Sequence, residues 1–186
     1  MESISSTLPY HYCRVHGSLE RKRFSWALEI LREIIKVEPK LVLAACGFSR
    51  AEADAVLMQL PEELKENVIL LPFVEEESMP ALYRGAVVVL YPTLYEGFGL
   101  PVVEAIASGT PIVFSALGSL AEFQGPGAIV IEPYNRDAWV SAVVNVARAG
   151  SYRNDFGAEG RRWAQKFSWH ESARKHFEIY SAVANF

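Results

Sequence analysis

Short apolar runs alternate with segments of helical periodicity along most of the chain. The apolar runs are bounded by charged residues, glycine or proline, and predict strands at residues 12–16, 41–46, 68–71, 86–91, 111–114 and 128–131. Elsewhere apolar residues recur every three or four positions and predict helices at residues 23–37, 51–60, 78–84, 101–108, 137–148, 153–166 and 169–184. Residues 1–9 are small and polar, and we expect them to form a flexible lead-in.

The alternation of these elements predicts one domain of the α/β class over residues 10–186. Strands that are apolar throughout are typical of a parallel sheet that is covered by helices on both faces. We therefore expect a single doubly wound, Rossmann-like domain with a parallel six-stranded sheet. In such sheets ligands bind beyond the carboxyl ends of the strands, so the loops at that edge are the candidates for a site.

Composition and charge exclude several classes of protein. The chain of 186 residues is 51% hydrophobic and 22% charged, which is typical of a globular domain. Its net charge of −4 gives no reason to expect binding to nucleic acid. No apolar run approaches the ~20 residues that a membrane helix needs, and the chain opens without a signal-peptide pattern. We expect a cytoplasmic protein, with the inner face of the membrane as an alternative for a longer form.

The segment 91–111, YPTLYEGFGLPVVEAIASGTP, leaves a predicted strand, passes through a glycine-rich loop and enters an apolar helix. Gly97 and Gly99 allow the backbone to approach a ligand closely, and the amides at the helix start favour an anion. Glu104 is the single charge of that helix, so it either pairs with neighbouring groups or accepts hydrogen bonds from ligand hydroxyls. Glu96 is either a solvated acid of the loop or a ligand contact.

A basic turn follows the first predicted strand. Gly17 and Ser18 leave that strand, and Arg21, Lys22 and Arg23 lie at the start of the next helix. Exposed cations at that end oppose the helix dipole at a cost of ~0.3–1 kcal/mol each. The arrangement indicates either an anion site, such as one for a diphosphate, or an exposed turn that a neighbouring glutamate and water neutralise.

Glu96 and Glu104, which have seven residues between them, resemble the E-x7-E motif of retaining glycosyltransferases of the GT-B fold, in the large family-four group. The run EGFGLPVVEAIASGTP is the most specific part of this resemblance. The similarity extends from residue 12 to about residue 180 and includes residues 17–20, 83–93, 115–122 and 167–169. A GT-B enzyme has two Rossmann-like domains, and this chain resembles the C-terminal one, which binds the donor.

The resemblance implies a role for each residue of the segment. Glu96 would contact the donor sugar as the catalytic carboxylate, and Glu104 would hold the ribose hydroxyls of the nucleotide. Backbone amides of Phe98, Gly99 and Leu100 would meet the sugar and the diphosphate, with Gly97 in the same loop. The resemblance also implies retention of anomeric configuration, with the nucleotide diphosphate sugar as substrate, no cofactor and no bound metal.

The basic turn departs from the family's pattern. Gly17 and Ser18 stand where many members have Gly-Arg, and Arg23, preceded by Lys22, falls on the family's lysine position. The positive charge that would neutralise the diphosphate is retained. Which of these side chains reaches the diphosphate is not decided by the sequence.

The resemblance also implies what the chain lacks. The N-terminal acceptor domain is absent, so we expect the isolated chain to be inactive in transfer. In this family the last helix, at residues 169–186, crosses toward the other domain, and its apolar face could drive self-association. The expected partners are a nucleotide-sugar, the N-terminal domain, and an acceptor glycan or glycolipid of polysaccharide biosynthesis. We expect peripheral contact with a membrane only in the full-length protein, and no nucleic acid.

Two other functions stay open. One is a nucleotide-sugar epimerase of the same fold, and the other is a non-catalytic module that binds a nucleotide-sugar or a partner protein. An oxidoreductase is disfavoured because the turn after the first strand lacks the pattern G-x-G-x-x-G. The base and the hexose of the donor are not fixed by the sequence, although family analogy favours GDP-mannose.

Overall fold

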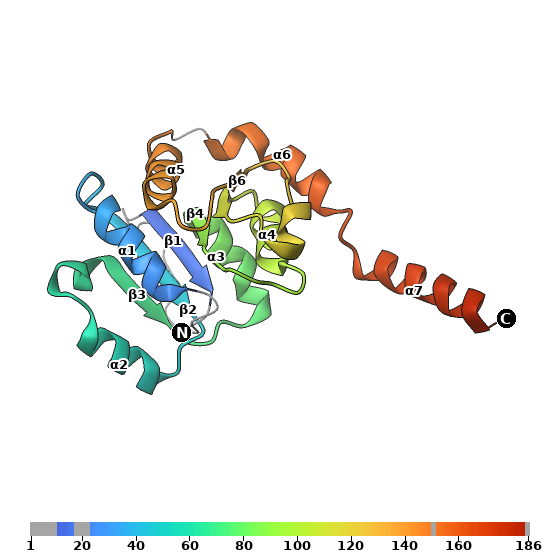
Figure 1. Ribbon diagram of the computed structural model, residues 1–186, viewed down its shortest axis with the longest axis horizontal. Helices are drawn as coiled ribbons and strands as arrows, with labels where there is room; N and C mark the ends of the chain where they lie inside the picture. Colours follow the sequence, from blue (N-terminus) through green and yellow to red (C-terminus); the bar gives the residue numbers. More distant parts are fainter. Residues whose placement is uncertain (1–10, 17–22, 150–151, 185–186) are drawn as a thin grey trace.

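A parallel sheet of six strands forms the centre of the molecule. The computed structural model describes residues 11–16, 23–149 and 152–184 (Figure 1). The strands lie in the order β3-β2-β1-β4-β5-β6, and every neighbouring pair is parallel. They are β1 (His11–His16), β2 (Leu41–Cys46), β3 (Val68–Leu71), β4 (Ala86–Tyr91), β5 (Ile112–Phe114) and β6 (Ala128–Val130). The strand order reverses between β1 and β4, which is where such sheets bind ligands.

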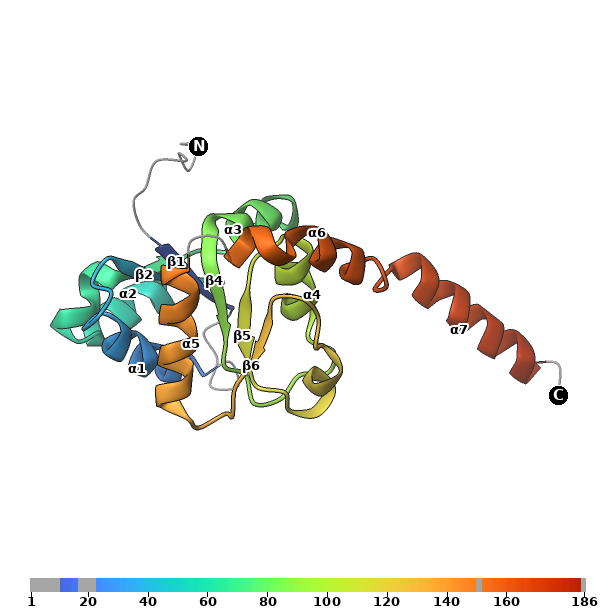
Figure 2. The same cartoon turned by 90° about the horizontal axis from the view of Figure 1, so that it is seen from above.

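Helices follow the strands and cover both faces of the sheet (Figure 2). They are α1 (Phe24–Ile34), α2 (Arg50–Gln59), α3 (Met79–Gly85), α4 (Leu100–Ala107), α5 (Arg136–Arg148), α6 (Tyr152–Ala164) and α7 (Trp169–Ala184). Three short 3-10 helices join them: η2 (Glu62–Asn67), η3 (Glu76–Ser78) and η4 (Gly118–Glu122). The predicted α/β Rossmann-like class is confirmed, whereas the 3-10 helices were not predicted. The expected lead-in lies outside the described residues.

The core is divided by the sheet into two apolar clusters. On one face, Val88 and Leu90 pack with the buried sides of α1 and α5, and on the other, Val89 and Tyr91 pack with α3 and α4. This division follows from the strand, because successive side chains of β4 point to opposite faces. The same alternation explains why β4 is apolar at every position.

The C-terminal helix α7 extends away from the domain (Figures 1 and 2). None of its described side chains is buried, and it exposes apolar residues such as Trp169, Phe177 and Tyr180. Among the described residues, no helix is both long enough and apolar enough to cross a membrane. An exposed apolar face of this kind contributes little to the stability of the domain that carries it.

Candidate functional site

The helix α4 is fixed at both ends by glycine. Gly99 caps its start with φ 108°, and a side chain at that position would collide with Leu120. At the other end Gly109 has φ 72°, and its N–H donates to the carbonyl of Ile106 over 3.0 Å. Both dihedrals lie where a residue with a Cβ is strained, so the two glycines define the length of α4.

The carboxylate of Glu96 is buried at the carboxyl edge of the sheet. Glu96 follows β4 in the chain and is only 9% exposed. The hydroxyl of Thr93, which is itself buried, donates to Oε1 of Glu96 over 2.9 Å. A buried carboxylate needs such partners, because desolvation is costly. Glu96 is therefore not the solvated loop acid that the sequence left open.

The backbone around Glu96 is also anchored from η4. The hydroxyl of Ser119 lies 2.8 Å from the carbonyl oxygen of Glu96 and 3.1 Å from that of Phe98. One donor between two carbonyls ties both ends of the glycine loop to a neighbouring segment. Sequence reasoning missed the role of Ser119, since its only signal is a place within residues 115–122 of the family resemblance.

Glu104 has one structural partner. The hydroxyl of Tyr83, which is 1% exposed, donates to Oε2 of Glu104 over 2.5 Å. The carbonyl of Tyr83 in turn accepts a hydrogen bond of 2.7 Å from the hydroxyl of Thr110. Within the described chain, Oε1 of Glu104 accepts no hydrogen bond, and Glu104 is only half-buried. One oxygen is thus held by Tyr83, as the structural alternative for Glu104 expects, and the other has room to accept from a ligand hydroxyl, so the ligand alternative stays a prediction.

Gly97, Phe98 and Leu100 are exposed beside this site. The ring of Phe98 packs edge-on against Phe123, with centroids 4.9 Å apart, and against Phe167, with centroids 6.1 Å apart. The ring of Phe98 is therefore engaged with two other aromatic rings, whereas the side chain of Leu100 is exposed.

The side chain of Arg23 is engaged in contacts within the domain. It caps α1 with φ 52°, and its guanidinium donates to the carbonyl of Pro133 over 2.8 Å. The guanidinium carbon also lies 4.6 Å from the ring centroid of Trp26 and 4.9 Å from that of Tyr134. Burial lowers the pKa of Arg23, while the charges of Tyr134 and Glu29 act in the opposite direction. The side chain predicted to neutralise a diphosphate is thus engaged in packing.

Other candidates of the basic turn lie outside the described residues, namely Gly17, Ser18 and Lys22. Among the residues that the structure does describe, no group of three or more histidine, cysteine or acidic side chains could hold a metal ion. The sequence-predicted residues that the structure brings together are those of the loop and of α4.

Comparison with known proteins identifies the family. The model of the glycosyl transferases group 1 family matches residues 12–163. The chain belongs to this family. It is 32% identical over 176 residues to the O-antigen chain mannosyltransferase B of Escherichia coli, and that match covers 92% of this chain and 46% of the relative. A match to an MMP α-(1→4)-mannosyltransferase of Mycolicibacterium hassiacum is 38% identical and covers 56% of this chain and 26% of that protein.

Solved structures of other proteins share the fold of this group 1 domain. A sucrose-phosphate synthase from Thermosynechococcus elongatus superposes with a TM-score of 0.80 at 22% identity, over 94% of this chain and 46% of that one. Anabaena HepE, crystallised with UDP-glucose, has a TM-score of 0.76 at 18% identity and covers 94% of this chain and 49% of its own. The predicted family and fold class are confirmed. The group 1 domain described here spans about half the length of the relative from Escherichia coli.

Proposed function

We propose that this chain is the donor-binding domain of a retaining glycosyltransferase that uses a nucleoside diphosphate hexose. The observation that carries the proposal is the buried carboxylate of Glu96 in the loop before α4. The hydroxyl of Thr93 donates to this carboxylate, and the hydroxyl of Ser119 donates to the backbone carbonyl of Glu96. In this proposal Glu96 contacts the donor sugar, and the open oxygen of Glu104 accepts hydrogen bonds from the ribose hydroxyls. A carboxylate oriented by buried partners is pre-organised, as a group acting on a reacting sugar has to be.

The charges of the reaction explain this arrangement. Cleavage of the bond between the anomeric carbon and the diphosphate leaves negative charge on the diphosphate and positive charge on the sugar. Amides of Phe98, Gly99 and Leu100, at the positive end of α4, would stabilise the leaving diphosphate. The carboxylate of Glu96 would offset the charge on the sugar. Because Arg23 is engaged in packing, Lys22 of the basic turn would supply the further positive charge.

The relatives suggest the sugar and the kind of acceptor. Two of them are named as mannosyltransferases, one acting on an O-antigen chain, which supports mannose as the hexose and a glycan or glycolipid as the acceptor. Because the chain spans 46% of the relative from Escherichia coli, we also propose that an N-terminal acceptor domain completes the enzyme. The chain alone would then bind the donor without completing the transfer.

The test is a calorimetric titration of the chain and of the full-length protein with GDP-mannose, UDP-glucose and UDP-N-acetylglucosamine. We expect saturable binding of one nucleotide class. Replacement Glu104→Gln should weaken that binding about tenfold, because a hydrogen bond to a charged acceptor is lost. Glu178→Gln is the matched control, since Glu178 is an exposed glutamate of α7. If the full-length protein bound none of the three donors, or if both variants weakened binding equally, the proposal would be wrong.

A further inference from the structure

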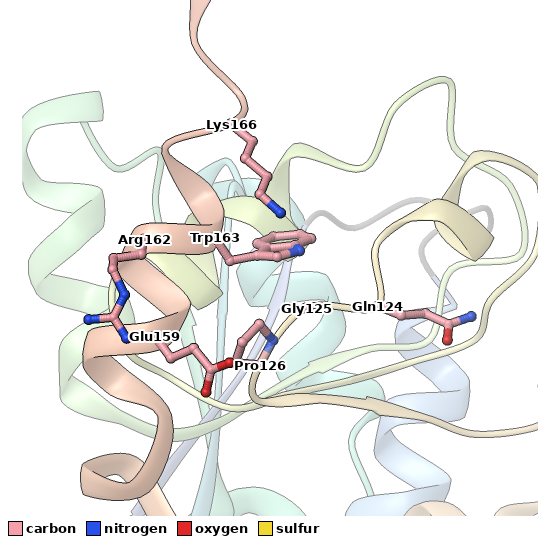
Figure 3. Close-up of a pocket in the computed structure, with 7 residues that line it drawn as sticks. All are labelled: Gln124, Gly125, Pro126, Glu159, Arg162, Trp163 and Lys166. Carbon is pink, nitrogen blue, oxygen red and sulfur yellow. The ribbon is translucent and has the colours of Figure 1, made fainter.

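A cavity of about 630 Å³ lies beside α6 (Figure 3). One wall consists of Glu159, Arg162 and Trp163 on α6 together with Lys166 just beyond its end, and residues 124–126 form the opposite wall. The spacing of the four side chains places them on one face of the helix. The cavity is separate from Glu96 and Glu104, neither of which lines it.

The indole of Trp163 is fixed in this cavity. A Cβ added to Gly125 would lie only 2.6 Å from the indole, so the ring packs directly on bare backbone. Its centroid is also 4.8 Å from that of Phe167. Figure 3 shows Gly125 and Pro126 on one side of the indole and the ammonium group of Lys166 reaching toward it from the other. A partly exposed aromatic ring held in this way is a pre-formed binding surface.

Three charged side chains line the cavity around the indole. In the described part of the chain, the side chains of Glu159, Arg162 and Lys166 make neither an ion pair nor a hydrogen bond. The wall therefore offers donors and acceptors of both charges next to an aromatic ring. A phosphate would be opposed by Glu159, whereas the hydroxyls of a sugar can donate to the carboxylate and accept from the cations. This chemistry favours a neutral polyol with an apolar ring face.

The cavity adjoins the candidate donor site through three aromatic rings. Phe167 contacts Trp163 in the cavity and also contacts Phe98, whose ring centroid is 6.1 Å away. Phe98 belongs to the loop that we propose to meet the donor sugar. A glycan whose end reaches that loop would extend over the cavity, whereas a ligand confined to the donor site would not reach it.

We propose that the cavity at Trp163 is a saccharide subsite that holds a hexose unit of the acceptor glycan. This inference rests on the proposed donor function of the neighbouring loop. The hexose ring packs on the indole, and its hydroxyls bond to Glu159 and Arg162. The subsite adds affinity for a longer glycan without taking part in the chemistry.

NMR spectra of the ¹⁵N-labelled chain test this proposal through the indole N–H signals of its tryptophans. The probes are α-linked mannotriose and maltotriose. Variants Trp163→Phe and Trp169→Phe assign the signals. We expect at least one trisaccharide to shift the Trp163 signal saturably while leaving that of Trp169, on α7, unmoved. The double variant Glu159→Gln with Arg162→Ala should weaken the interaction about tenfold. Because these two side chains make no described hydrogen bond or ion pair, the variant should fold normally.

The control variant is Arg174→Ala on α7, which should bind the trisaccharide as the parent chain does. The subsite would be refuted if neither trisaccharide moved the Trp163 signal, or if the double variant bound as tightly as Arg174→Ala. Titration of the same samples with GDP-mannose and UDP-glucose keeps the two proposals apart. Donor binding without a trisaccharide response overturns only the subsite. A trisaccharide response without donor binding by the full-length protein supports the saccharide site and counts against the donor function.

Discussion

The helices α4 and α7 both carry apolar side chains, but these side chains are buried in α4 and exposed in α7. In α4, the residues Val102, Ala105 and Ile106 are fully buried against the sheet and α6. In α7, no described residue is buried, and Ile179 and Tyr180 lie exposed. Periodicity thus determines that a helix forms, while the partners present determine whether its apolar face contributes to stability. Matched substitutions in the two regions measure the difference.

The largest expected difference is between two isoleucines. Ile106→Ala in α4 should lower the free energy of unfolding by about 2–5 kcal/mol, because it leaves a cavity in a packed core. Ile179→Ala in α7 should change it by less than ~0.5 kcal/mol, since Ile179 is 60% exposed and Ile106 is 0% exposed. Chemical denaturation of both variants checks this comparison. Equal losses would show that α7 is packed against something in solution, for example a second copy of the chain.

The strands and the helices could be predicted from the sequence, because their signals are local. Three strands, β2, β3 and β4, have the predicted bounds, since each is an apolar run between a helix and a breaker or charge. The loop before α4 is likewise a local signal, because Gly97 and Gly99 are visible in the sequence itself. The family resemblance implies ligand roles for Glu96 and Glu104, which physics alone divides between structural and functional alternatives, and these roles stay predictions.

Long-range partners could not be predicted in this way. Ser119 lies 23 residues from Glu96, and Tyr83 lies 21 residues from Glu104. Neither residue carries a local signal, because the hydrogen bonds arise only when η4 and α3 are placed by the sheet. The engagement of Arg23 with Pro133 is more distant still, across 110 residues. For the same reason, the sequence could not show which cation of the basic turn is engaged in packing.

The second comparison lies within the glycine loop itself. Gly99→Ala should lower the free energy of unfolding by about 2–4 kcal/mol, because φ is positive and the methyl group meets Leu120. Gly97→Ala should have a small effect, since a Cβ at Gly97 meets nothing within 4 Å. Thermal unfolding of the two variants separates them. A large loss in Gly97→Ala would mean that the loop changes conformation in solution.

We expect a smaller difference in stability between substitutions of two tyrosines, one in α3 and one in α7. Tyr83→Phe removes the hydroxyl that donates to Glu104, which should lower the free energy of unfolding by about 1–3 kcal/mol. Tyr180→Phe in α7 should be neutral, since Tyr180 is exposed. Chemical denaturation measures both values. If Tyr83→Phe left the free energy of unfolding unchanged, the hydrogen bond between Tyr83 and Glu104 would not stabilise the fold. The only role left for Glu104 would then be ligand binding.

The smallest expected effect concerns the pH response of α7. A hydrogen bond from Arg174 lowers the pKa of Glu171 below its ordinary value of 4.5. A lowered pKa in the folded state means that this stabilisation is present above the unfolded pKa and is lost as pH falls through the folded one. Amide exchange in α7 should therefore accelerate, relative to α4, as pH falls below 4.5. Replacement Glu171→Gln should abolish that pH dependence. If α4 and α7 responded alike in both chains, the two helices would share one cooperative unit, and the contrast between them would fail.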